Sequence, residues 1–376
     1  MIASRPMARI ALALSLLVAA LSLVMFLPMP TFGLWLVRLA LRETSLGLAL
    51  LASLAAGLAG LGQRRSPRTS LLALAVALIG GLLATSPFLA AGQDFAASGN
   101  SFSLLEYFRG APAPPITPRT LPLSPEVTAD VYRSPGDGSR PLVVVVHGGS
   151  WQRGARGEAE RTSRALAAAG YVVADVGYRL APAHLFPAAV ADVKCAVGRL
   201  RERAGELQID PRRVALLGRS AGGEIALVAA YSTGDAAIPP ACAVADAPVS
   251  GVISLYAPTD LVWGHANPLV PDPIDGPRTI ETYLGGPPAA RPEAYRLASA
   301  TSWVFRPLPS TLIVHGGGDQ LVSPEHARRL FTALGDAAQP VELLLVPFAD
   351  HGFDRRSGGV GEQLARARIL KFLGAL

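Results

Sequence analysis

Apolar and polar positions follow two different patterns along the chain. Residues 1–92 contain three apolar stretches, at 7–27, 44–62 and 69–92, and the first of them carries a single charge, Arg9. A helix needs about 20 apolar residues to cross a bilayer. The first part of the chain, residues 1–92, is therefore predicted to be an anchor of about three transmembrane helices.

Two other interpretations of these stretches stay open. Basic residues precede the first stretch, a pattern that is also typical of a secretory signal peptide. Helices buried inside a soluble protein are similarly apolar. The two further stretches favour the three-helix anchor, as does the polar segment QRRSPR at 63–68, which is typical of a short loop at a membrane edge.

Beyond residue 92 the pattern changes to short apolar runs that alternate with helical periodicity. Residues 93–125 include a proline-rich segment at 109–125, and we expect a linker or entry segment there, without a helix or a central strand. The candidate strands are 127–133, 142–149, 171–179, 214–220, 250–258, 311–318 and 341–347. The candidate helices are 157–169, 187–204, 220–232, 324–335 and 361–374.

Continuous Val and Leu runs that alternate with helices are typical of a parallel sheet covered on both faces. Residues 126–376 are therefore predicted to form an α/β domain. Residues 261–303 interrupt the alternation, because they are rich in Pro, Gly and aromatic residues. We expect this segment to be an insertion that caps the carboxyl edge of the sheet.

The net charge of +6 does not indicate a nucleic-acid surface once the charges are located. Residues 1–92 hold seven of the 34 basic residues and one of the 28 acidic ones, so the remainder holds 27 of each. A basic excess confined to apolar segments concerns membrane topology. We therefore expect a membrane partner and no nucleic-acid partner.

The positions of the N-terminal arginines predict the orientation of the anchor. If the N-terminus is in the cytoplasm, the inner side has five arginines and the outer loop has two. The inner ones are Arg5, Arg9, Arg64, Arg65 and Arg68, and the outer ones are Arg38 and Arg42. By the positive-inside rule, everything after residue 92 is predicted to lie outside the cytoplasm.

Cys195 and Cys242 are the two cysteines of the chain, too few for a disulfide framework or a zinc site of their own. One bridge between them is an open alternative. The preferred interpretation from sequence is two separate buried thiols, because unpaired cysteine is among the most buried residue types.

A short motif at the junction of a predicted strand and a predicted helix is the first candidate for chemistry. Residues 218–222, GRSAG, match the pattern G-x-S-x-G in the strand-to-helix context that this pattern requires. One interpretation is a tight turn that needs glycines for backbone room. The other is a nucleophile elbow that presents Ser220.

A serine nucleophile needs a base, and the base needs an acid that orients it. Asp319 and His351 follow Ser220 in the order that the elbow fold uses, each just after a predicted strand. Asp350 is a less favoured acid because it is next to His351 in sequence, and Asp260 is expected to cap the following segment. The remaining histidines considered, His265, His315 and His326, are expected to be structural or solvated.

The glycine-rich segment HGGSW, at 147–151, follows the predicted strand LVVVV. Backbone N–H groups of such a loop can point at a developing oxyanion where no side chain blocks the approach. Gly148 and Gly149 are the candidate donors, together with the N–H of Ala221. A simple glycine turn is the alternative, but it does not explain why Ser220, Asp319 and His351 also follow successive strands.

Together these residues resemble the α/β-hydrolase superfamily, especially the hormone-sensitive-lipase-like esterases. The resemblance covers about residues 126–374 and rests on HGGSW, YRLAPAHLFPAAVADV, GRSAGG, YAPTD and DHGF. It implies an α/β-hydrolase fold, and an architectural role for the segment that begins at Tyr178. Arg219 replaces the usual acidic residue before the nucleophile and Ser150 replaces the third glycine, departures that feruloyl-esterase-like and formamidase-like relatives share in part.

The expected function is a membrane-anchored serine carboxylester hydrolase that acts on a small or lipid ester without a metal or an organic cofactor. Trp151 is a weaker candidate for substrate binding, and the role of Arg219 stays open. A peptidase or amidase is an alternative, since GGGDQLVSPEHA also resembles the acid loop of prolyl-oligopeptidase-like peptidases. An envelope acyltransferase would use the same triad, and a non-catalytic membrane scaffold is the least favoured alternative.

Overall fold

The structure, a computed structural model, describes residues 4–98 and 101–376. Residues 1–3 of the predicted anchor and residues 99–100 of the predicted linker lie outside the described part of the chain. The chain divides into two compact units. One comprises Met1–Gly110 with Val346–Leu364, and the other comprises Ala111–Leu345 with Ala365–Leu376.

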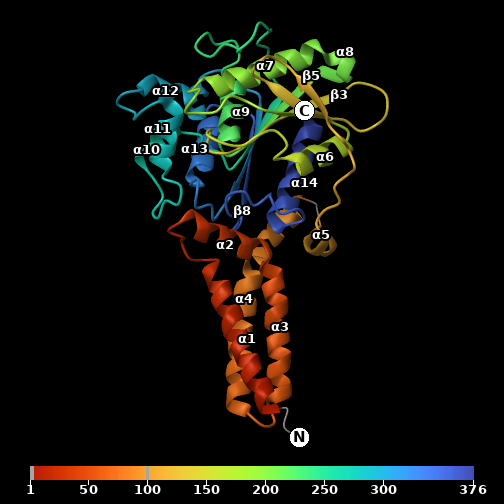
Figure 1. Ribbon diagram of the computed structural model, residues 1–376, viewed down its shortest axis with the longest axis vertical. Coiled ribbons are helices and arrows are strands. Elements are labelled where there is room, and N and C mark those ends of the chain that lie inside the picture. The colour runs from red at the N-terminus through yellow and green to blue at the C-terminus, as the bar shows by residue number, and fades with distance from the viewer. Residues whose placement is uncertain (1–3, 99–100) are drawn as a thin grey trace. The chain divides into compact units, whose positions relative to one another are not determined.

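The larger unit is built on a sheet that, in the described residues, has eight strands in the order β1-β2-β4-β3-β5-β6-β7-β8 (Figure 1). The strands are β1 (Arg119–Pro122), β2 (Thr128–Tyr132), β3 (Arg140–Val146), β4 (Val172–Val176), β5 (Ile209–Arg219), β6 (Gly251–Leu255), β7 (Ser310–Gly316) and β8 (Val341–Val346). Each predicted strand is present, and β1 is additional. Pro122 is tolerated there because β1 is an edge strand, paired antiparallel to β2 alone.

The central strands are parallel and buried on both faces. β3 pairs in parallel with β4 and β5, and the pairing continues in parallel through β6 to β7. Residues 142–146 of β3 have no exposed surface, which explains their uninterrupted Leu and Val sequence. Because β4 and β5 lie on opposite sides of β3, the strand order reverses there, and in such sheets a ligand crevice forms at the carboxyl ends beside that point.

Helices follow the strands as the alternating pattern predicts. They are α6 (Glu160–Ala168), α7 (Ala188–Glu202), α8 (Ala204–Leu207), α9 (Ala221–Tyr231), α13 (Glu325–Asp336) and α14 (Val360–Ala375). α9 packs on β5 and β6, and α7 packs on α9. α8 is the one short helix of this set that the sequence pattern did not predict.

The segment that interrupts the alternation folds as short helices. They are α10 (Leu261–Ala266), α11 (Gly276–Leu284), α12 (Pro292–Ala298) and a 3-10 turn at Ala300–Trp303. Its large aromatic side chains, Tyr283, Tyr295 and Trp303, are almost completely buried and belong to the main hydrophobic core.

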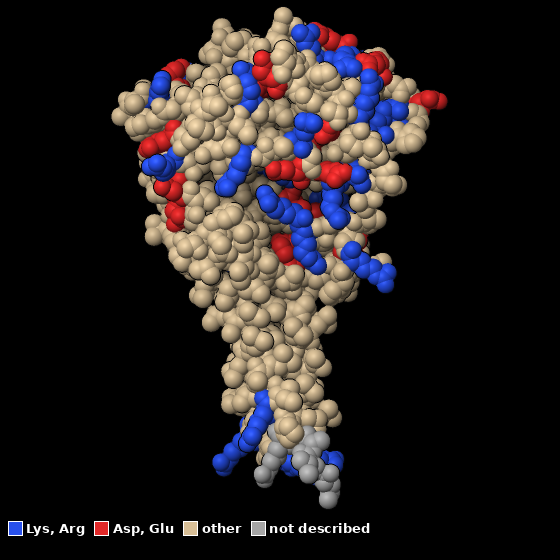
Figure 2. Space-filling view, viewed as in Figure 1, with Lys and Arg blue, Asp and Glu red and all other residues tan. Residues whose placement is uncertain are grey.

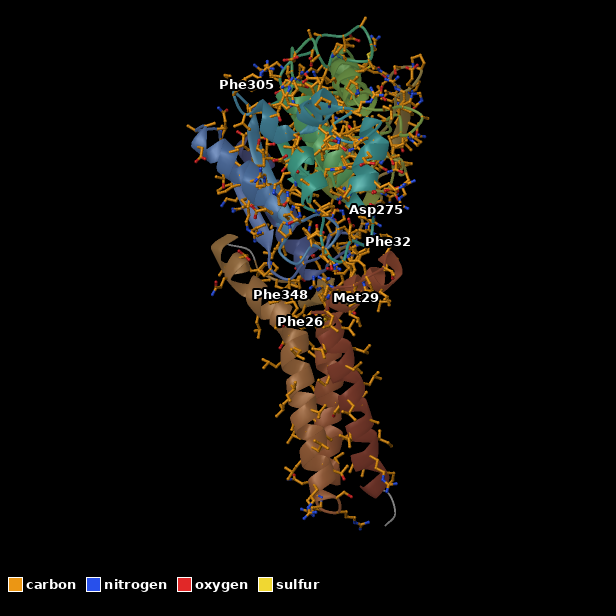
Figure 3. The ribbon with its side chains drawn as sticks, turned by 90° about the vertical axis from the view of Figure 1, so that its left-hand side faces the viewer. Phe26, Met29, Phe32, Asp275, Phe305 and Phe348 are labelled. Carbon is orange, nitrogen blue, oxygen red and sulfur yellow. A yellow bond between two sulfur atoms is a disulfide. The ribbon has the colours of Figure 1, made fainter. Side chains whose placement is uncertain are left out.

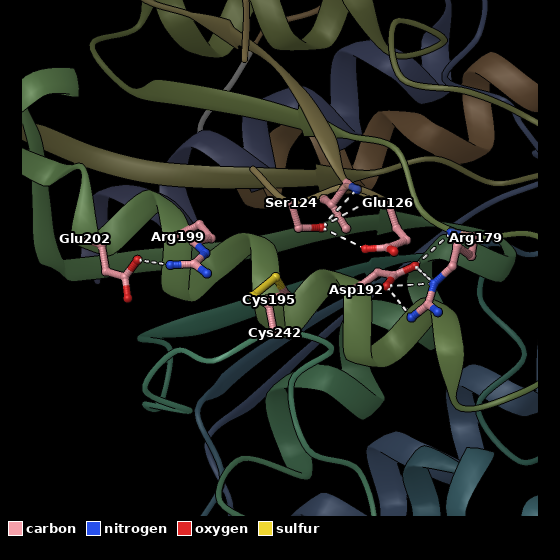
Figure 4. Close-up of a disulfide and its surroundings, with 9 residues drawn as sticks. Ser124, Glu126, Arg179, Asp192, Cys195, Arg199, Glu202 and Cys242 are labelled. Atoms are coloured by element: carbon pink, nitrogen blue, oxygen red, sulfur yellow. Dashed lines mark hydrogen bonds and ion pairs between the residues drawn. A yellow bond between two sulfur atoms is a disulfide. The ribbon is translucent and has the colours of Figure 1, made fainter. Parts of the chain in front are cut away.

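Cys195 and Cys242 form a disulfide that joins α7 to the segment before β6 (Figure 4). The expectation of two separate buried thiols is therefore wrong. The partners are 47 residues apart in the sequence, so no local spacing indicates the pairing. Their Cα atoms lie 5.4 Å apart, because α7 and the loop through Cys242 pack side by side.

The smaller unit contains, within the described residues, three helices long and apolar enough to cross a membrane: α1 (Ser4–Val24), α3 (Ser45–Gly62) and α4 (Pro67–Ser98). Small residues let these helices approach closely. A Cβ atom added to Gly62 would lie 3.0 Å from the Cβ of Ala8, and Ser15 donates a hydrogen bond to the Ala73 carbonyl at 2.9 Å.

Charged side chains and exposed apolar side chains occupy different parts of this bundle. On the face drawn in Figure 2, the described part of the bundle is free of charge along its length and carries Lys or Arg side chains at the end where α3 turns into α4. Leucines such as Leu17, Leu54 and Leu82 are more than half exposed. This arrangement suggests a membrane anchor.

Two shorter helices of the smaller unit were not predicted from the sequence. α2 (Phe32–Glu43) begins after Thr31, whose hydroxyl accepts the N–H of Leu34, and α5 (Leu104–Arg109) begins after Ser103. Trp35, Arg38 and Leu39 of α2 are buried. Their spacing of three and four residues is that of one helix face, and the segment between α1 and α3 is therefore an amphipathic helix instead of a plain loop.

Candidate active site

Ser220 lies at the sharp turn between β5 and α9. Its backbone has φ of 53° and ψ of −124°, a conformation that L-residues rarely adopt and that costs about 1–3 kcal/mol. The Ser220 N–H donates to the carbonyl of Leu255 at 2.9 Å, which holds the turn against β6. A strained strand-to-helix turn of this kind is what the predicted nucleophile elbow requires.

The elbow packs directly against the glycine-rich loop that follows β3. A Cβ atom added to Gly222 would overlap the carbonyl oxygen of His147, so this position accepts glycine alone. A Cβ atom added to Gly148 would lie 3.3 Å from the Cβ of Ser220. The predicted oxyanion loop and the predicted nucleophile are therefore neighbours at the point where the strand order reverses.

The loop itself is held in an unusual backbone conformation. Gly149 has φ of 118°, and Ser150 and Trp151 have φ of 54° and 61° although they carry side chains. Behind the loop, the ring of Tyr178 stacks on the ring of His147, with 4.2 Å between the ring centroids. The Tyr178 hydroxyl donates to the His147 carbonyl at 2.9 Å. Tyr178 thus has the architectural role that the resemblance implies.

Trp151 points into the protein and contacts a buried carboxyl group. Its indole N–H donates to Oε2 of Glu224 at 2.8 Å, and its ring stacks on Tyr283 of α11 at 4.5 Å. Burial raises the pKa of Glu224 to about 8, although the bond from Trp151 opposes the shift. Glu224 is a site neighbour that the sequence reasoning missed. The available signal was one acidic residue in the apolar run after Ser220.

Asp319 follows β7, where a loop of backbone donors orients it. Its Oδ1 accepts the N–H groups of Leu321 and Val322 at 2.8 and 2.9 Å. Its Oδ2 lies 3.2 Å from Nε2 of His315, which is completely buried and also lies 3.0 Å from the Val322 carbonyl. His315 therefore has a structural role beside Asp319.

Two other histidines and one acidic alternative have structural partners. His326 accepts the backbone N–H groups of Thr259 and Asp260 at Nδ1, and burial lowers its pKa to about 3, so the ring is neutral. His265 contacts Glu281 at 2.9 Å. Asp260 caps α10 by accepting the N–H of Trp263 at 2.9 Å, as expected from the sequence.

Arg219, whose role was open, bonds to α6 beside the elbow. Its Nη2 donates to the hydroxyl of Thr162 at 2.7 Å. Burial raises the pKa of Asp175 on β4 to about 7, while the Gly157 N–H and the Arg219 guanidinium oppose the shift. Arg219 thus supplies positive charge to a buried carboxyl group and a link to α6.

His351 lies five residues after β8, in the segment Val346–Leu364 that belongs to the smaller unit. Its side chain is largely buried. The approach of His351 to Ser220 and Asp319 stays a prediction. Asp350, the less favoured acid, is completely buried and accepts the backbone N–H of His351 at 2.9 Å and the indole N–H of Trp35 at 3.0 Å.

The comparisons with curated proteins point to esterases. The probable carboxylic ester hydrolase LipM of Mycobacterium tuberculosis is 28% identical over 230 residues, which are 60% of this chain and 53% of that protein. The esterase LipQ of the same organism is 28% identical over 257 residues, which are 66% of this chain and 59% of that protein. The chain thus spans only a little more than half the length of these relatives.

Solved structures with the same fold include a thermophilic esterase from Thermogutta terrifontis, with 23% identity and a TM-score of 0.55 over 69% of this chain and 93% of that chain. A bacterial heroin esterase has 23% identity and a TM-score of 0.59 over 77% of this chain and 91% of that chain. These likenesses confirm the predicted fold. The family model described as BD-FAE matches residues 129–334, more than half of the chain. The chain therefore belongs to the BD-FAE family and has the α/β-hydrolase fold.

Proposed function

We propose that this chain is a membrane-anchored carboxylic ester hydrolase that works through an acyl-enzyme on Ser220. The observation that carries the proposal is the strained elbow of Ser220, packed within 3.3 Å of the position that a Gly148 Cβ would take. That proximity supports the proposal, because acyl transfer requires backbone N–H donors near the nucleophile. The names of the curated relatives, a carboxylic ester hydrolase and esterases, support the same reaction class.

In the first half of the reaction, Ser220 Oγ attacks the ester carbonyl carbon while His351 takes the hydroxyl proton. The negative charge that develops on the carbonyl oxygen is stabilised by the N–H groups of Gly148, Gly149 and Ala221. Each such donor contributes about 3 kcal/mol to the lowering of the barrier. The carbon–oxygen bond then breaks, and His351 returns the proton to the departing alcohol.

In the second half, water attacks the acyl-enzyme and His351 accepts its proton. The tetrahedral intermediate collapses to the carboxylic acid, and the proton returns to Ser220. Asp319 orients the imidazole and stabilises its charged form. Its fixed carboxylate supports this role, because the N–H groups of Leu321 and Val322 hold Oδ1 while His315 lies beside Oδ2.

The catalytic unit lies outside the cytoplasm in this proposal. The arginine distribution of residues 1–92 supports it by the positive-inside rule. The Cys195–Cys242 disulfide is independent support, because disulfides persist in oxidising compartments outside the cytoplasm. Protease added to intact cells should cleave the chain beyond residue 92, and full protection beside a degraded outer marker would contradict the orientation.

A serine-directed fluorophosphonate probe on membranes tests the nucleophile. We expect labelling of the wild type and none of Ser220→Ala. Ser250→Ala is the matched control, since Ser250 bonds to the Arg212 carbonyl at the opposite end of β6 and should label normally. Equal labelling of Ser220→Ala and wild type would remove Ser220 as the nucleophile.

The substrate class needs a second measurement on the same membranes. p-Nitrophenyl esters of increasing acyl length, compared with a matched p-nitroanilide, separate an esterase from an amidase. We expect turnover of the esters and not of the anilide. Faster turnover of the anilide would favour the peptidase alternative, and acyl transfer to an added alcohol in preference to water would favour an acyltransferase.

A further inference from the structure

Helix α2 has two faces with different chemistry. Trp35 and Arg38 are buried with 4% and 5% of their surface exposed, and Arg42 lies one turn further along the same face. The rest of the helix surface exposes four large apolar side chains, namely Phe32, Leu34, Leu36 and Val37. An amphipathic helix usually buries apolar residues and exposes charged ones. In α2 two arginines lie on the buried face beside Trp35 and Leu39, so these buried polar groups must have partners.

Their shared partner is the carboxylate of Asp350. Trp35 Nε1 donates to Oδ1 at 3.0 Å, while Arg38 Nε and Arg42 Nη1 lie 3.2 and 3.3 Å from Oδ2. The backbone N–H of His351 also donates to Oδ1 at 2.9 Å. One buried carboxylate therefore joins three side chains of α2 to the main chain at His351.

The charges around this carboxylate come from both packed segments. Arg38, Arg42 and Glu43 lie on α2, and Asp354 and Arg356 lie on the loop after His351. Burial raises the pKa of Glu43 to about 8, so at neutral pH this group is mostly protonated and competes little with Asp350 for the arginines. Removal of one member of a buried ion pair leaves an uncompensated buried charge, so the separation of these groups is strongly unfavourable.

Two further contacts fix the same loop to the N-terminal helices. The Phe348 ring meets the ring of Phe26, two residues beyond the end of α1, edge to face with 5.7 Å between the ring centroids (Figure 3). The Arg356 guanidinium lies 4.2 Å above the ring of Tyr107, whose hydroxyl donates to the Glu43 carbonyl at 3.0 Å. Contacts at positions 348, 350 and 356 thus hold His351 from both sides.

Arg42 also connects the loop to the first long helix. Its Nε donates to the carbonyl of Met25, just beyond the end of α1, at 2.7 Å. The same guanidinium therefore satisfies a carbonyl at the helix end and the carboxylate of Asp350. A displacement of the end of α1 is transmitted through one side chain to the residue next to His351.

We propose that Asp350 is a positioning residue for His351, fixed by Trp35, Arg38 and Arg42 of α2, so that the N-terminal helices set the orientation of the general base. This role rests on the proposed function of His351. Asp319 would orient the imidazole ring, whereas Asp350 fixes the main chain that carries it. A base displaced by about 1 Å can lose about 100-fold in rate.

The test uses the full-length protein in its membrane and measures kcat, KM and fluorophosphonate labelling rate with p-nitrophenyl butyrate as substrate. For Trp35→Phe, which keeps an aromatic ring and loses the N–H, we expect kcat to fall about tenfold. For Asp350→Asn we expect a fall of about 100-fold. KM should stay within about twofold, because α2 supplies no acyl-binding group in this proposal. Arg355→Gln, an exposed change on the same loop, is the matched control.

A pair of substitutions at one position separates positioning from general damage to the fold. Arg42→Lys keeps a cation near Asp350 and should retain most of the activity, whereas Arg42→Met should lose about as much as Asp350→Asn. If Arg42→Lys and Arg42→Met have the same kcat and lose the same thermal stability, the positioning role of Asp350 is refuted. Wild-type kcat in folded Trp35→Phe and Arg42→Met would overturn it as well, even if Asp350→Asn does not fold.

His351→Ala keeps this outcome distinct from failure of the proposed function. Loss of activity in His351→Ala together with normal kcat in Trp35→Phe and Arg42→Met leaves the triad intact and refutes the positioning role alone. Full activity of His351→Ala would refute the triad itself, and the positioning role with it.

Discussion

Removal of the Cys195–Cys242 disulfide is expected to destabilise the larger unit substantially. The bridge closes a loop with a sequence separation of 47 residues. In the chain-entropy treatment, a loop of that length contributes about 4 kcal/mol to the free energy of unfolding. For a unit of this size the loss corresponds to a decrease in Tm of about 10 °C.

The assay is thermal unfolding of the detergent-solubilised protein with and without reductant. The double variant Cys195→Ala with Cys242→Ala should unfold at the temperature of the reduced wild type, and reductant should not change it further. Titration of thiols in the denatured, non-reduced wild type should find none free. Two titratable thiols in protein taken from its natural membrane would refute the pairing, and an unchanged Tm after complete reduction would refute the loop-entropy magnitude.

Three further outcomes follow from the site. Gly222→Ala should abolish labelling of Ser220 by fluorophosphonate, because the added Cβ overlaps the carbonyl of His147, and normal labelling would contradict the elbow geometry. Asp319→Asn should lower kcat by about 10⁴-fold with little change in KM, measured on p-nitrophenyl butyrate. Burial raises the pKa of Glu224 from its usual 4.5 to about 8, so the folded state holds this proton more tightly than the unfolded state does. The free energy of unfolding should therefore fall as pH rises from about 4.5 to 8, and Glu224→Gln should remove that part of the pH dependence of Tm.

The parts of the site that could be predicted from the sequence are those with a local pattern. Ser220 follows an apolar strand and precedes an apolar helix, and glycines flank it at fixed offsets. The same logic located HGGSW after β3 and Asp319 after β7. In a parallel sheet the strand ends share one edge, so strand positions alone predict which loops lie near one another.

The features that could not be predicted depend on contacts between distant segments. Trp35 and Asp350 are 315 residues apart, and nothing in the order of residues 32–43 indicates which carboxylate their polar side chains bind. The sequence prediction used Arg38 and Arg42 only as charges that set the membrane orientation. It therefore did not include their ion pairs with Asp350. The disulfide was missed on the same grounds, since pairing over 47 residues depends on the packing of α7.

The smaller unit is built from two separate parts of the chain, and this has a consequence for biosynthesis. A ribosome makes residues 1–110 long before residues 346–364, yet both are needed to complete this unit. Arg42 is therefore made 308 residues before Asp350, whose carboxylate it binds, although domains otherwise tend to fold in order of synthesis. We therefore expect the loop that carries His351 to fold late. On the proposed function, a chain interrupted before residue 350 would contain the three apolar helices and Ser220 but would lack His351, the proposed general base.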